Sequence, residues 1–341
     1  MREESMRPYP KITVIALCYN HERFLKASLE SIRAQTYTDY ELIVVDDYSS
    51  DNSPAIIVEW IEANCPAARL ILHKKNVGIC KSLNEALAMA QGEYLSILAA
   101  DDLWEATKLE KHVAALDSLG PAYAVVYSDA LQIDEDGRLL PLKFMLRHRR
   151  DGSVPQGDVF LCLADRNFIP SMAATIRREA ILAVGGYDER LCYEDWDIWL
   201  RLAAKWRFAF IPDTLAQYRV VQTSLARKLI QSSIQRSLTH TLIGEKCLAS
   251  GRLTPALTAQ WKARMLEDSY ELLTLGYPQA AAHLMAAFRL KPGFRIGLVA
   301  TLATLGVSGS QMLRIRSFLF RSRDQQAVSR PKSSLRSGWL R

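Results

Sequence analysis

The segment ITVIALCYN, Ile12–Asn20, indicates the fold class of this chain, because a run of apolar and β-branched residues typical of a buried strand ends directly in polar residues. Two similar stretches follow: ELIVVDD at Glu41–Asp47 and EYLSILAADD at Glu93–Asp102. Between the first two, Phe24–Gln35 carries apolar residues at helical spacing. Strands that alternate with helices at these intervals predict an α/β fold whose parallel sheet is covered on both faces.

The same alternation extends outward from these stretches. RLILH at Arg69–His73 predicts another strand and Lys81–Ala90 another helix. Further along the chain the pattern loosens, and its expected elements are a strand at Ala124–Ser128, a hairpin turn at Asp136-Gly137, an exposed loop at Leu146–Asp151, an extended segment at Ser171–Ile176, a tight turn at Gly185-Gly186, and a helix at Glu194–Lys205.

Polar residues gather where the predicted strands end. They form four clusters, at Asn20–Glu22, Asp46–Asp51, Asn76–Gly78 and Asp101-Asp102. In open α/β sheets, ligands bind outside the carboxyl ends of the strands. These clusters are therefore the expected binding site.

Composition and cysteine spacing limit the class of protein. The 341 residues are 49% hydrophobic and 23% charged, which is ordinary for a globular protein and argues against disorder, collagen or a coiled coil. The six cysteines contain no C-x-x-C pair, so neither a zinc site nor a disulfide framework is predicted. The charged N-terminal residues lack the apolar stretch of a secretory signal, and a cytosolic protein with reduced thiols is expected.

Common catalytic motifs are missing from the sequence. We find no G-x-S-x-G nucleophile elbow, no G-x-G-x-x-G dinucleotide fingerprint and no G-x-x-x-x-G-K-[ST] phosphate loop after the first strand. The chemistry must therefore come from the acidic strand-end clusters. Asp101 and Asp102 are the kind of ligand that Mg²⁺ or Mn²⁺ takes, although the same residues would also suit a helix N-terminus. Likewise, Asp46–Asp51 would suit a turn that satisfies its own backbone.

Charge divides the chain into two domains, 1–225 and 226–341. The second carries 18 Lys and Arg against 5 Asp and Glu, a net +13, which leaves −7 for the first because the whole chain has +6. Its pattern is helical, with breaks at Gly251, Pro278 and Pro292-Gly293.

Within the basic domain, Ile296–Leu313 has no charge and is flanked by arginines. Either an interfacial helix on an anionic cytosolic membrane or a soluble helix with a solvated basic end fits this pattern. Nucleic-acid binding is not expected, because no recognised motif or aromatic stacking platform accompanies the charge.

Several separated motifs resemble the successive blocks of family 2 glycosyltransferases. They are ITVIALCYN, SLESIRAQTYTDYELIVVDDYSSDNS, NVGICKSLNEALAMAQGEYLSILAADD and IRREAILAVGGYDERLCYEDWDIWLRLA, in the family's order and spacing over Lys11–Arg219. The resemblance implies a GT-A fold with a mixed, mostly parallel sheet and a C-terminal helical extension. It also implies transfer of a sugar from a nucleotide-diphospho-sugar to an acceptor hydroxyl, with inversion at the anomeric carbon.

The resemblance assigns roles to residues of this chain. Asp195 falls on the position of the general base, beside Glu194, and Asp101 with Asp102 falls on the metal-binding D-x-D region, for Mg²⁺ or Mn²⁺. Asp47 would accept a hydrogen bond from a uracil or thymine N–H, since a carboxylate offers only acceptors. The full set of expected nucleotide-binding residues is Leu17, Tyr19, Asn20, Glu22, Asp47, Asn76, Lys81 and Asp101.

Two departures from the family pattern leave a second hypothesis open. Ala99 replaces the first acidic residue of the D-x-D, and Val221 stands where members often carry a histidine. Fewer charged ligands weaken metal binding. We expect an active enzyme that uses UDP or dTDP sugars, with a glycan or lipid-linked acceptor, in bacterial-type surface polysaccharide synthesis. The alternative is a non-catalytic scaffold that binds nucleotide-sugars but has a degraded metal site.

Overall fold

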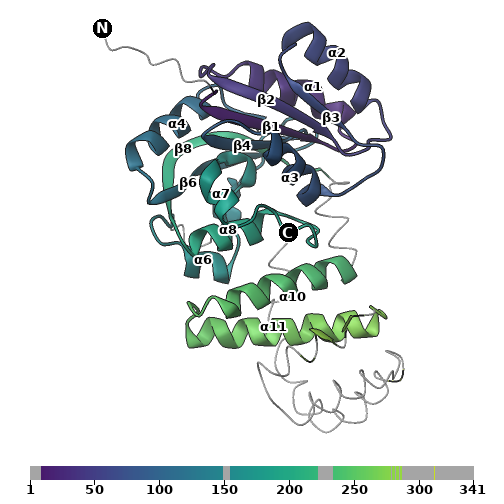
Figure 1. The fold of residues 1–341 in the computed structure, drawn as a ribbon, viewed down its shortest axis with the longest axis vertical. Coiled ribbons are helices and arrows are strands. Elements are labelled where there is room, and N and C mark those ends of the chain that lie inside the picture. Colours follow the sequence, from purple (N-terminus) through teal and green to yellow (C-terminus); the bar gives the residue numbers. More distant parts are fainter. Residues whose placement is uncertain are drawn as a thin grey trace. The chain divides into compact units, whose positions relative to one another are not determined.

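The computed structural model describes residues 9–148, 154–221, 233–277, 279, 280, 282, 283, 285 and 311. Its contacts divide the chain into two compact units, Met1–Gln222 and Thr223–Arg341. The division lies near residue 225, in a segment outside the described residues. Figure 1 shows the mixed sheet and its helices in the first unit, and the helices α10 and α11 of the second.

An eight-stranded sheet forms the centre of the first unit, in the order β3-β2-β1-β4-β7-β6-β8-β5. Four of its pairings are parallel: β1 with β2, β1 with β4, β2 with β3, and β6 with β8. The strands are β1 Ile12–Cys18, β2 Tyr40–Asp46, β3 Arg69–Leu72, β4 Tyr94–Ala99, β5 Leu103–Trp104, β6 Tyr123–Ile133, β7 Ala174–Arg177 and β8 Arg207–Arg219. The predicted mixed, mostly parallel sheet is confirmed.

Helices cover both faces of this sheet, as expected for a chain in which strands alternate with helices. Leu95 and Ile97 of β4 face Ile198 and Trp199, whereas Ser96 between them accepts a hydrogen bond from Lys108 on the opposite face. The helices of this unit are α1 Glu22–Arg33, α2 Ser53–Asn64, α3 Ile79–Met89, α4 Lys108–Leu119, α5 Phe144–His148, α6 Phe160–Asp165, α7 Arg178–Ala183 and α8 Asp195–Ala203, with the 3₁₀ turn η1 Ser171–Ala173.

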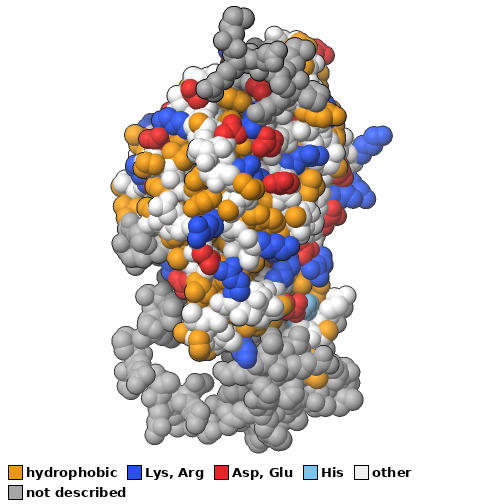
Figure 2. All heavy atoms as spheres, turned by 60° about the vertical axis from the view of Figure 1, so that its left-hand side comes forward, with side chains coloured by type: hydrophobic (Ala, Val, Ile, Leu, Met, Phe, Trp, Pro, Cys, Tyr) orange, Lys and Arg blue, Asp and Glu red, His pale blue; other side chains and the backbone are white. Residues whose placement is uncertain are grey.

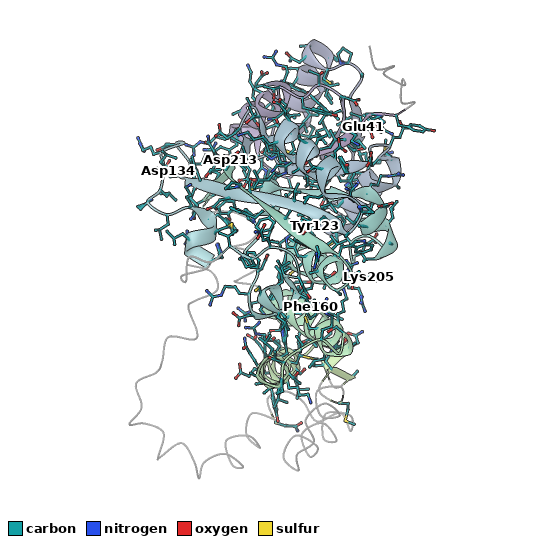
Figure 3. The ribbon with its side chains drawn as sticks, turned by 90° about the vertical axis from the view of Figure 1, so that its left-hand side faces the viewer. Glu41, Tyr123, Asp134, Phe160, Lys205 and Asp213 are labelled. Atoms are coloured by element: carbon teal, nitrogen blue, oxygen red, sulfur yellow. The ribbon has the colours of Figure 1, made fainter. Side chains whose placement is uncertain are left out.

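Burial explains why β1 and β4 lie at the middle of the sheet. Ile12, Val14, Tyr94 and Leu98 are all fully buried and belong to one core that also takes in the apolar face of α1. Strands buried on both faces read as continuous apolar runs, which is the pattern of the sequence at these positions. Toward the other edge of the sheet, β6 and β8 are the longest strands. Tyr123 is the first residue of β6, and Asp134 directly follows its last residue (Figure 3).

Most predicted elements are found, one is wrong and one is found only in part. The segment Ser171–Ile176, expected to be extended, begins as the 3₁₀ turn η1 and becomes a strand from Ala174. The turn at Gly185-Gly186 is confirmed, with φ of 83° and 70°, a region that glycine adopts without steric cost. The exposed loop expected from Leu146 is instead the end of α5, because Met145 packs inside the protein and draws Phe144–His148 into a helical turn. The rest of that expected loop lies outside the described residues.

The second unit contains a helical pair, α10 Ser233–Ala249 and α11 Pro255–Thr274. Thr254 caps α11 by accepting a hydrogen bond from the Leu257 N–H. Gly244 allows the helices to approach closely, since a Cβ there would lie 2.7 Å from the side chain of Met265. The predicted break at Gly251 is confirmed by the loop between the two helices.

Two further expectations for this basic unit cannot be compared with the structure. The uncharged stretch Ile296–Leu313 and the breaks at Pro278 and Pro292-Gly293 fall outside the described residues, apart from residue 311. Among the helices that are described, none is both long and apolar enough to cross a membrane. On the face of the molecule drawn in Figure 2, acidic, basic and apolar side chains of the described residues are interspersed.

Candidate functional site

The loops after β1 and β2 are tied together at the carboxyl edge of the sheet. Asn20 has a φ of 57°, which asparagine tolerates better than most residues. Its side-chain oxygen accepts a hydrogen bond from the Ser50 N–H at 2.7 Å, and its own N–H donates to Ser49 Oγ at 2.8 Å. Glu22 accepts from the Asn52 N–H at 2.8 Å. The structure therefore brings Asn20 and Glu22 together, with their polar atoms engaged in holding the loops.

Asp46 and Asp51 fulfil the turn role that their sequence pattern allowed. Asp46 accepts hydrogen bonds from the main-chain N–H and the hydroxyl of Ser49. Asp51 accepts from the N–H groups of Ser53 and Glu22. Both carboxylates thus satisfy nearby backbone and are structural parts of the rim.

Asp47 is different, because its carboxylate reaches across to the next loop. Its Oδ1 accepts from the Val77 N–H at 2.8 Å, and its Oδ2 accepts from the Gly78 N–H at 2.9 Å. The Asn76 side chain donates to the Asp47 carbonyl at 3.3 Å. His73 also contacts Asp47 Oδ1, at 2.9 Å. Asp47 and Asn76, both predicted as nucleotide ligands, therefore belong to one network.

The remaining predicted nucleotide ligands lie at or near the same edge, with differing exposure. Tyr19, at the end of β1, is 38% exposed. Lys81 in the first turn of α3 is also exposed. Leu17 is partly buried, and its carbonyl accepts a hydrogen bond from the Ala100 N–H, which joins β1 to the loop after β4.

Asp101 and Asp102 follow β4 and have unequal surroundings. Asp102 is 3% exposed, and its Oδ1 accepts from the Arg219 N–H at 2.8 Å. Burial, and then the negative charge of Asp101, raise the pKa of Asp102 well above its ordinary value. Asp101 is more accessible, with a side chain 13% exposed, and its Oδ2 lies 3.7 Å from His21 Nε2.

Asp101 and Asp102 have the carboxylate oxygens for part of the ligand set of a divalent cation. Within the described ranges, no group of three or more His, Cys, Asp or Glu residues is arranged to hold a metal ion. Asp101 and Asp102 do supply the oxygen donors that Mg²⁺ and Mn²⁺ prefer. Mg²⁺ is commonly bound by one or two carboxylates together with substrate phosphates, so phosphate oxygens would complete the set. Ala99, at the end of β4, has a methyl side chain and offers no carboxylate.

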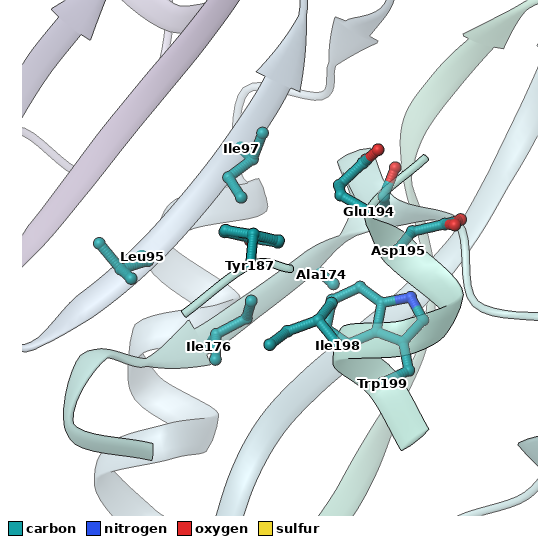
Figure 4. A pocket seen from close by; sticks show the side chains of 10 residues that line it. Leu95, Ile97, Ala174, Ile176, Tyr187, Glu194, Asp195, Ile198 and Trp199 are labelled. Carbon is teal, nitrogen blue, oxygen red and sulfur yellow. The ribbon is translucent and has the colours of Figure 1, made fainter. Parts of the chain in front are cut away.

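Glu194 and Asp195 stand at the start of α8, at the edge of a small pocket (Figure 4). Asp195 Oδ2 accepts from the Asn167 side chain at 2.8 Å, and its Oδ1 accepts from the Trp196 N–H. Figure 4 shows both carboxylates at one side of the pocket and the apolar side chains of Leu95, Ile97 and Ile176 at the other. An acidic pair therefore borders an apolar wall.

This environment changes the acidity of both groups. Burial, and then the charge of Asp195, raise the pKa of Glu194 to about 8. Burial also raises the pKa of Asp195, while hydrogen bonds from Trp196 and Asn167 oppose that change. A carboxylate with a raised pKa is a stronger base once it is ionised. Asp195 is partly exposed and held in a fixed orientation, and its raised pKa makes its carboxylate a stronger base.

The charges of both acidic pairs affect Tyr218, which lies near the end of β8. Burial raises its pKa, and the negative charges of Asp102, Asp101 and Asp195 raise it further. Both pairs therefore lie within electrostatic reach of one phenol near the end of β8. Val221, two residues after Arg219, is buried, so the histidine that is common in the family has no polar replacement here.

Three residues of the site were not singled out from the sequence. His73 is the last residue of a predicted strand and Arg219 ends the range that resembles the family, while Asn167 lies in none of the quoted motifs. Each acts by bonding to an acidic residue distant in the chain: Asp47, Asp102 and Asp195 respectively. His73 and Arg219 lie at the carboxyl ends of β3 and β8, and Asn167 follows α6, but these positions do not identify the acidic partner of each residue.

Comparison with known proteins agrees with the family resemblance of the sequence motifs. The family model described as glycosyl transferase family 2 matches residues 13–185. EpsE of Bacillus subtilis is 34% identical over 207 residues, which are 58% of this chain and 68% of EpsE. Rv1520 of Mycobacterium tuberculosis is 32% identical over 213 residues, or 61% of this chain. The match covers only 58% of the length of Rv1520.

Solved structures share the fold at low sequence identity. S. aureus TarS 1-349 in complex with UDP-GlcNAc has a TM-score of 0.59 and 17% identity, covering 91% of each chain. The mannosyltransferase PcManGT from Pyrobaculum calidifontis, in complex with GDP-Man and Mn²⁺, has a TM-score of 0.55 and 22% identity. It covers 92% of this chain and 88% of its own. The GT-A fold class predicted from sequence is confirmed.

Proposed function

This chain belongs to glycosyl transferase family 2, and from that premise we propose that it transfers a sugar from a nucleotide-diphospho-sugar to an acceptor hydroxyl. The proposed catalytic domain is 1–225, followed by a basic helical extension at 226–341. The observation that carries the proposal is the presence of two acidic clusters with oriented carboxylates. Asp102, beside Asp101, accepts a hydrogen bond from the Arg219 N–H, and Asp195, beside Glu194, accepts one from the Asn167 side chain. The first cluster suits a diphosphate-bound cation and the second suits proton abstraction.

The nucleotide would bind along the loops after β1, β2 and β3. Asp47 has three donors already, from His73, Val77 and Gly78. Because a carboxylate has about four acceptor positions, one remains for the N–H of a base. Uracil, thymine and guanine offer such an N–H. We assign UDP or dTDP sugars on family grounds, with Tyr19, Asn20, Glu22, Leu17, Asn76 and Lys81 as the other contacts.

The donor diphosphate would lie beside Asp101 and Asp102. A bound Mg²⁺ or Mn²⁺ supplies positive charge that neutralises the diphosphate and favours its departure. Asp101, being the less buried, would be the main protein ligand, and the Arg219 N–H orients the carboxylate of Asp102.

Asp195 is the proposed base. Its carboxylate takes the proton of the acceptor hydroxyl as the hydroxyl oxygen forms a bond to the anomeric carbon. The bond from that carbon to the diphosphate oxygen breaks, and its electron pair leaves with the nucleoside diphosphate. One displacement of this kind inverts the anomeric centre. Asn167 keeps Asp195 oriented, and Glu194, with its raised pKa, limits the negative charge beside it.

The setting of the reaction is a further part of the proposal. We assign a glycan or lipid-linked acceptor in bacterial-type surface polysaccharide synthesis, and a cytosolic location at or near the inner face of the membrane. The support is the family and the net +13 of residues 226–341, which would favour anionic lipid headgroups.

The experiment that tests the function is transfer from radiolabelled UDP- and dTDP-sugars to a lipid or glycan extract, by wild-type protein and by Asp195→Asn. Active wild-type protein and an inactive variant that still binds nucleotide support the enzyme. Wild-type protein that binds nucleotide but transfers no sugar from any donor supports the alternative, a non-catalytic scaffold in which Ala99 and Val221 mark a degraded metal site.

A further inference from the structure

His73 bridges two carboxylates that come from different elements. Its Nδ1 lies 2.9 Å from Asp47 Oδ1 after β2, and its Nε2 lies 2.9 Å from Glu85 Oε2 on α3. The imidazole is 9% exposed, so water does not replace these contacts easily. The His73 N–H also donates to the Asp46 carbonyl at 3.0 Å, which fixes the start of the loop. His73 is thus held on three sides.

Both ring nitrogens face carboxylate oxygens, and this decides the protonation state that suits the site. A neutral imidazole has one N–H, so it can donate to Asp47 or to Glu85 but not to both. Only the imidazolium donates to both at once. Charge-assisted hydrogen bonds of this type are about twice as strong as neutral ones.

The bridge determines the position of the loop that follows. Asp47, which His73 orients, also accepts from the Val77 and Gly78 N–H groups. Gly78 has a φ of 89° and precedes α3, the helix that carries Glu85. A closed series of contacts therefore holds the loop. Asp47 contacts His73, His73 contacts Glu85 on α3, and the N–H of Gly78, directly before α3, donates to Asp47.

We propose that His73 is a positioning residue of the nucleotide site, which holds Asp47 and the loop 76–78 in the arrangement that receives the base. The inference rests on the proposed function. The Asp47–His73–Glu85 bridge does not touch the reacting atoms. It acts by leaving one acceptor position of Asp47 directed at the ligand and by preventing collapse of the loop.

The bridge makes nucleotide affinity depend on pH. The charged groups that face His73 are Asp47 from the end of β2 and Glu85 from α3, and Lys74 and Lys75 follow it on its own loop. Burial alone lowers the pKa of His73, but the hydrogen bonds and charges of Glu85 and Asp47 raise it above the ordinary value. The bridge is therefore complete below about pH 6.5, the ordinary histidine value, and is lost as the pH rises through the higher folded pKa.

The test is calorimetric titration from pH 6 to pH 9 with whichever of UDP, dTDP and GDP the wild-type chain binds most tightly. The variants are His73→Gln and Glu85→Gln, with Glu59→Gln on the exposed side of α2 as the matched control. Titration of the nucleotide itself is common to all four proteins, so it cancels in the ratio of variant to wild-type Kd.

At pH 6, His73→Gln is expected to bind about tenfold more weakly than wild type, the effect of one charge-assisted contact. That ratio should shrink as the pH rises, because the wild-type bridge is lost as well. Glu85→Gln should move the fall in affinity to lower pH, and Glu59→Gln should match wild type. Amide exchange of Val77 and Gly78 in the nucleotide-free protein should be faster in His73→Gln.

A His73→Gln variant with wild-type affinity at every pH would overturn the inference while leaving the proposed function intact. So would a constant ratio accompanied by unchanged exchange at Val77 and Gly78. A wild-type chain that binds none of the three nucleotides would instead contradict the proposed function, and with it this role of His73. Glu85→Gln changes a partly exposed residue, so it keeps the test decisive if His73→Gln fails to fold.

Discussion

The main-chain N–H of Arg219 lies 2.8 Å from Asp102 Oδ1, and the Arg219 side chain donates to the Asp101 carbonyl at 2.9 Å. One residue at the end of β8 therefore holds both members of the acidic pair after β4. The guanidinium is itself fixed, because it donates to the Asp134 carbonyl at 3.0 Å and lies 4.7 Å from the centroid of Phe24. The acidic turn is positioned by a buried cation.

Arg219→Met should weaken metal-dependent nucleotide binding about tenfold, since a shift in the partners that orient metal ligands typically costs 10–100-fold in affinity. Nucleotide binding without metal should change little. The measurement is UDP affinity with and without Mn²⁺. Arg207→Met, exposed at the other end of the same strand, is the control. An equal loss with and without metal would contradict the assigned role.

Asp195→Asn should lower the rate of sugar transfer by at least about 100-fold, because removal of a general base forfeits a contribution of about 10²–10⁴. Nucleotide affinity should be unchanged, because Asp195 contacts Asn167 and Trp196 and not the nucleotide loops. Turnover is followed by release of nucleoside diphosphate. Unimpaired turnover in the variant would remove Asp195 from the mechanism.

Asn167→Ala should shift the acidic limb of the pH–rate profile to higher pH. The Asn167 side chain donates to Asp195 and opposes the rise that burial imposes on its pKa. Without that donor the pKa of Asp195 is higher still, so the ionised base appears only at higher pH. The profile of kcat/KM against pH measures the shift. A limb that stays in place while kcat falls would mean that Asn167 contacts the acceptor instead.

Lys108→Met should raise the free energy of unfolding at pH 7 by about 1 kcal/mol or more, because a buried charge is costly. Lys108 is fully buried and donates to Ser96 and Thr175. Burial lowers its pKa well below the ordinary value. Between this lowered folded pKa and the unfolded pKa of about 10.4, unfolding takes up a proton, so wild-type stability rises with pH over that range.

Urea unfolding of both proteins at pH 6, 7.5 and 9 measures this effect. The advantage of Lys108→Met should shrink toward pH 9, because the cost of the buried amine falls in the wild type. An advantage that is constant across these pH values, or a variant less stable throughout, would show that the hydrogen bonds of Lys108 outweigh its burial cost.

The sequence predicts the part of the sheet with the order β3-β2-β1-β4, because the apolar runs of β2, β1 and β4 are buried on both faces. It also placed Asp47, Asp101 and Asp195 at strand or helix ends. The antiparallel β7 and the long, irregular β8 gave weaker patterns, since register shifts in β6 and β8 interrupt the alternation of side chains.

The sequence does not indicate which residues contact the acidic side chains of the site. Asp47 contacts His73, 26 residues later, and Asp102 contacts Arg219, 117 residues later. Such contacts depend on strand order, which local patterns do not encode. Conversely, α5 is not predicted, because a helix of five residues with one buried side chain, Met145, is too short to show a helical spacing of apolar residues.

The proposed function requires this chain to bind a nucleotide-diphospho-sugar at the carboxyl edge of its sheet with help from Asp101 and Asp102. Calorimetric titration of wild-type protein with UDP, dTDP and GDP, each with and without Mn²⁺, measures this binding directly. We expect UDP or dTDP to bind, more tightly with Mn²⁺, and Asp101→Asn to remove the metal effect. Failure of all three nucleotides to bind, with metal or without it, would contradict the proposed function.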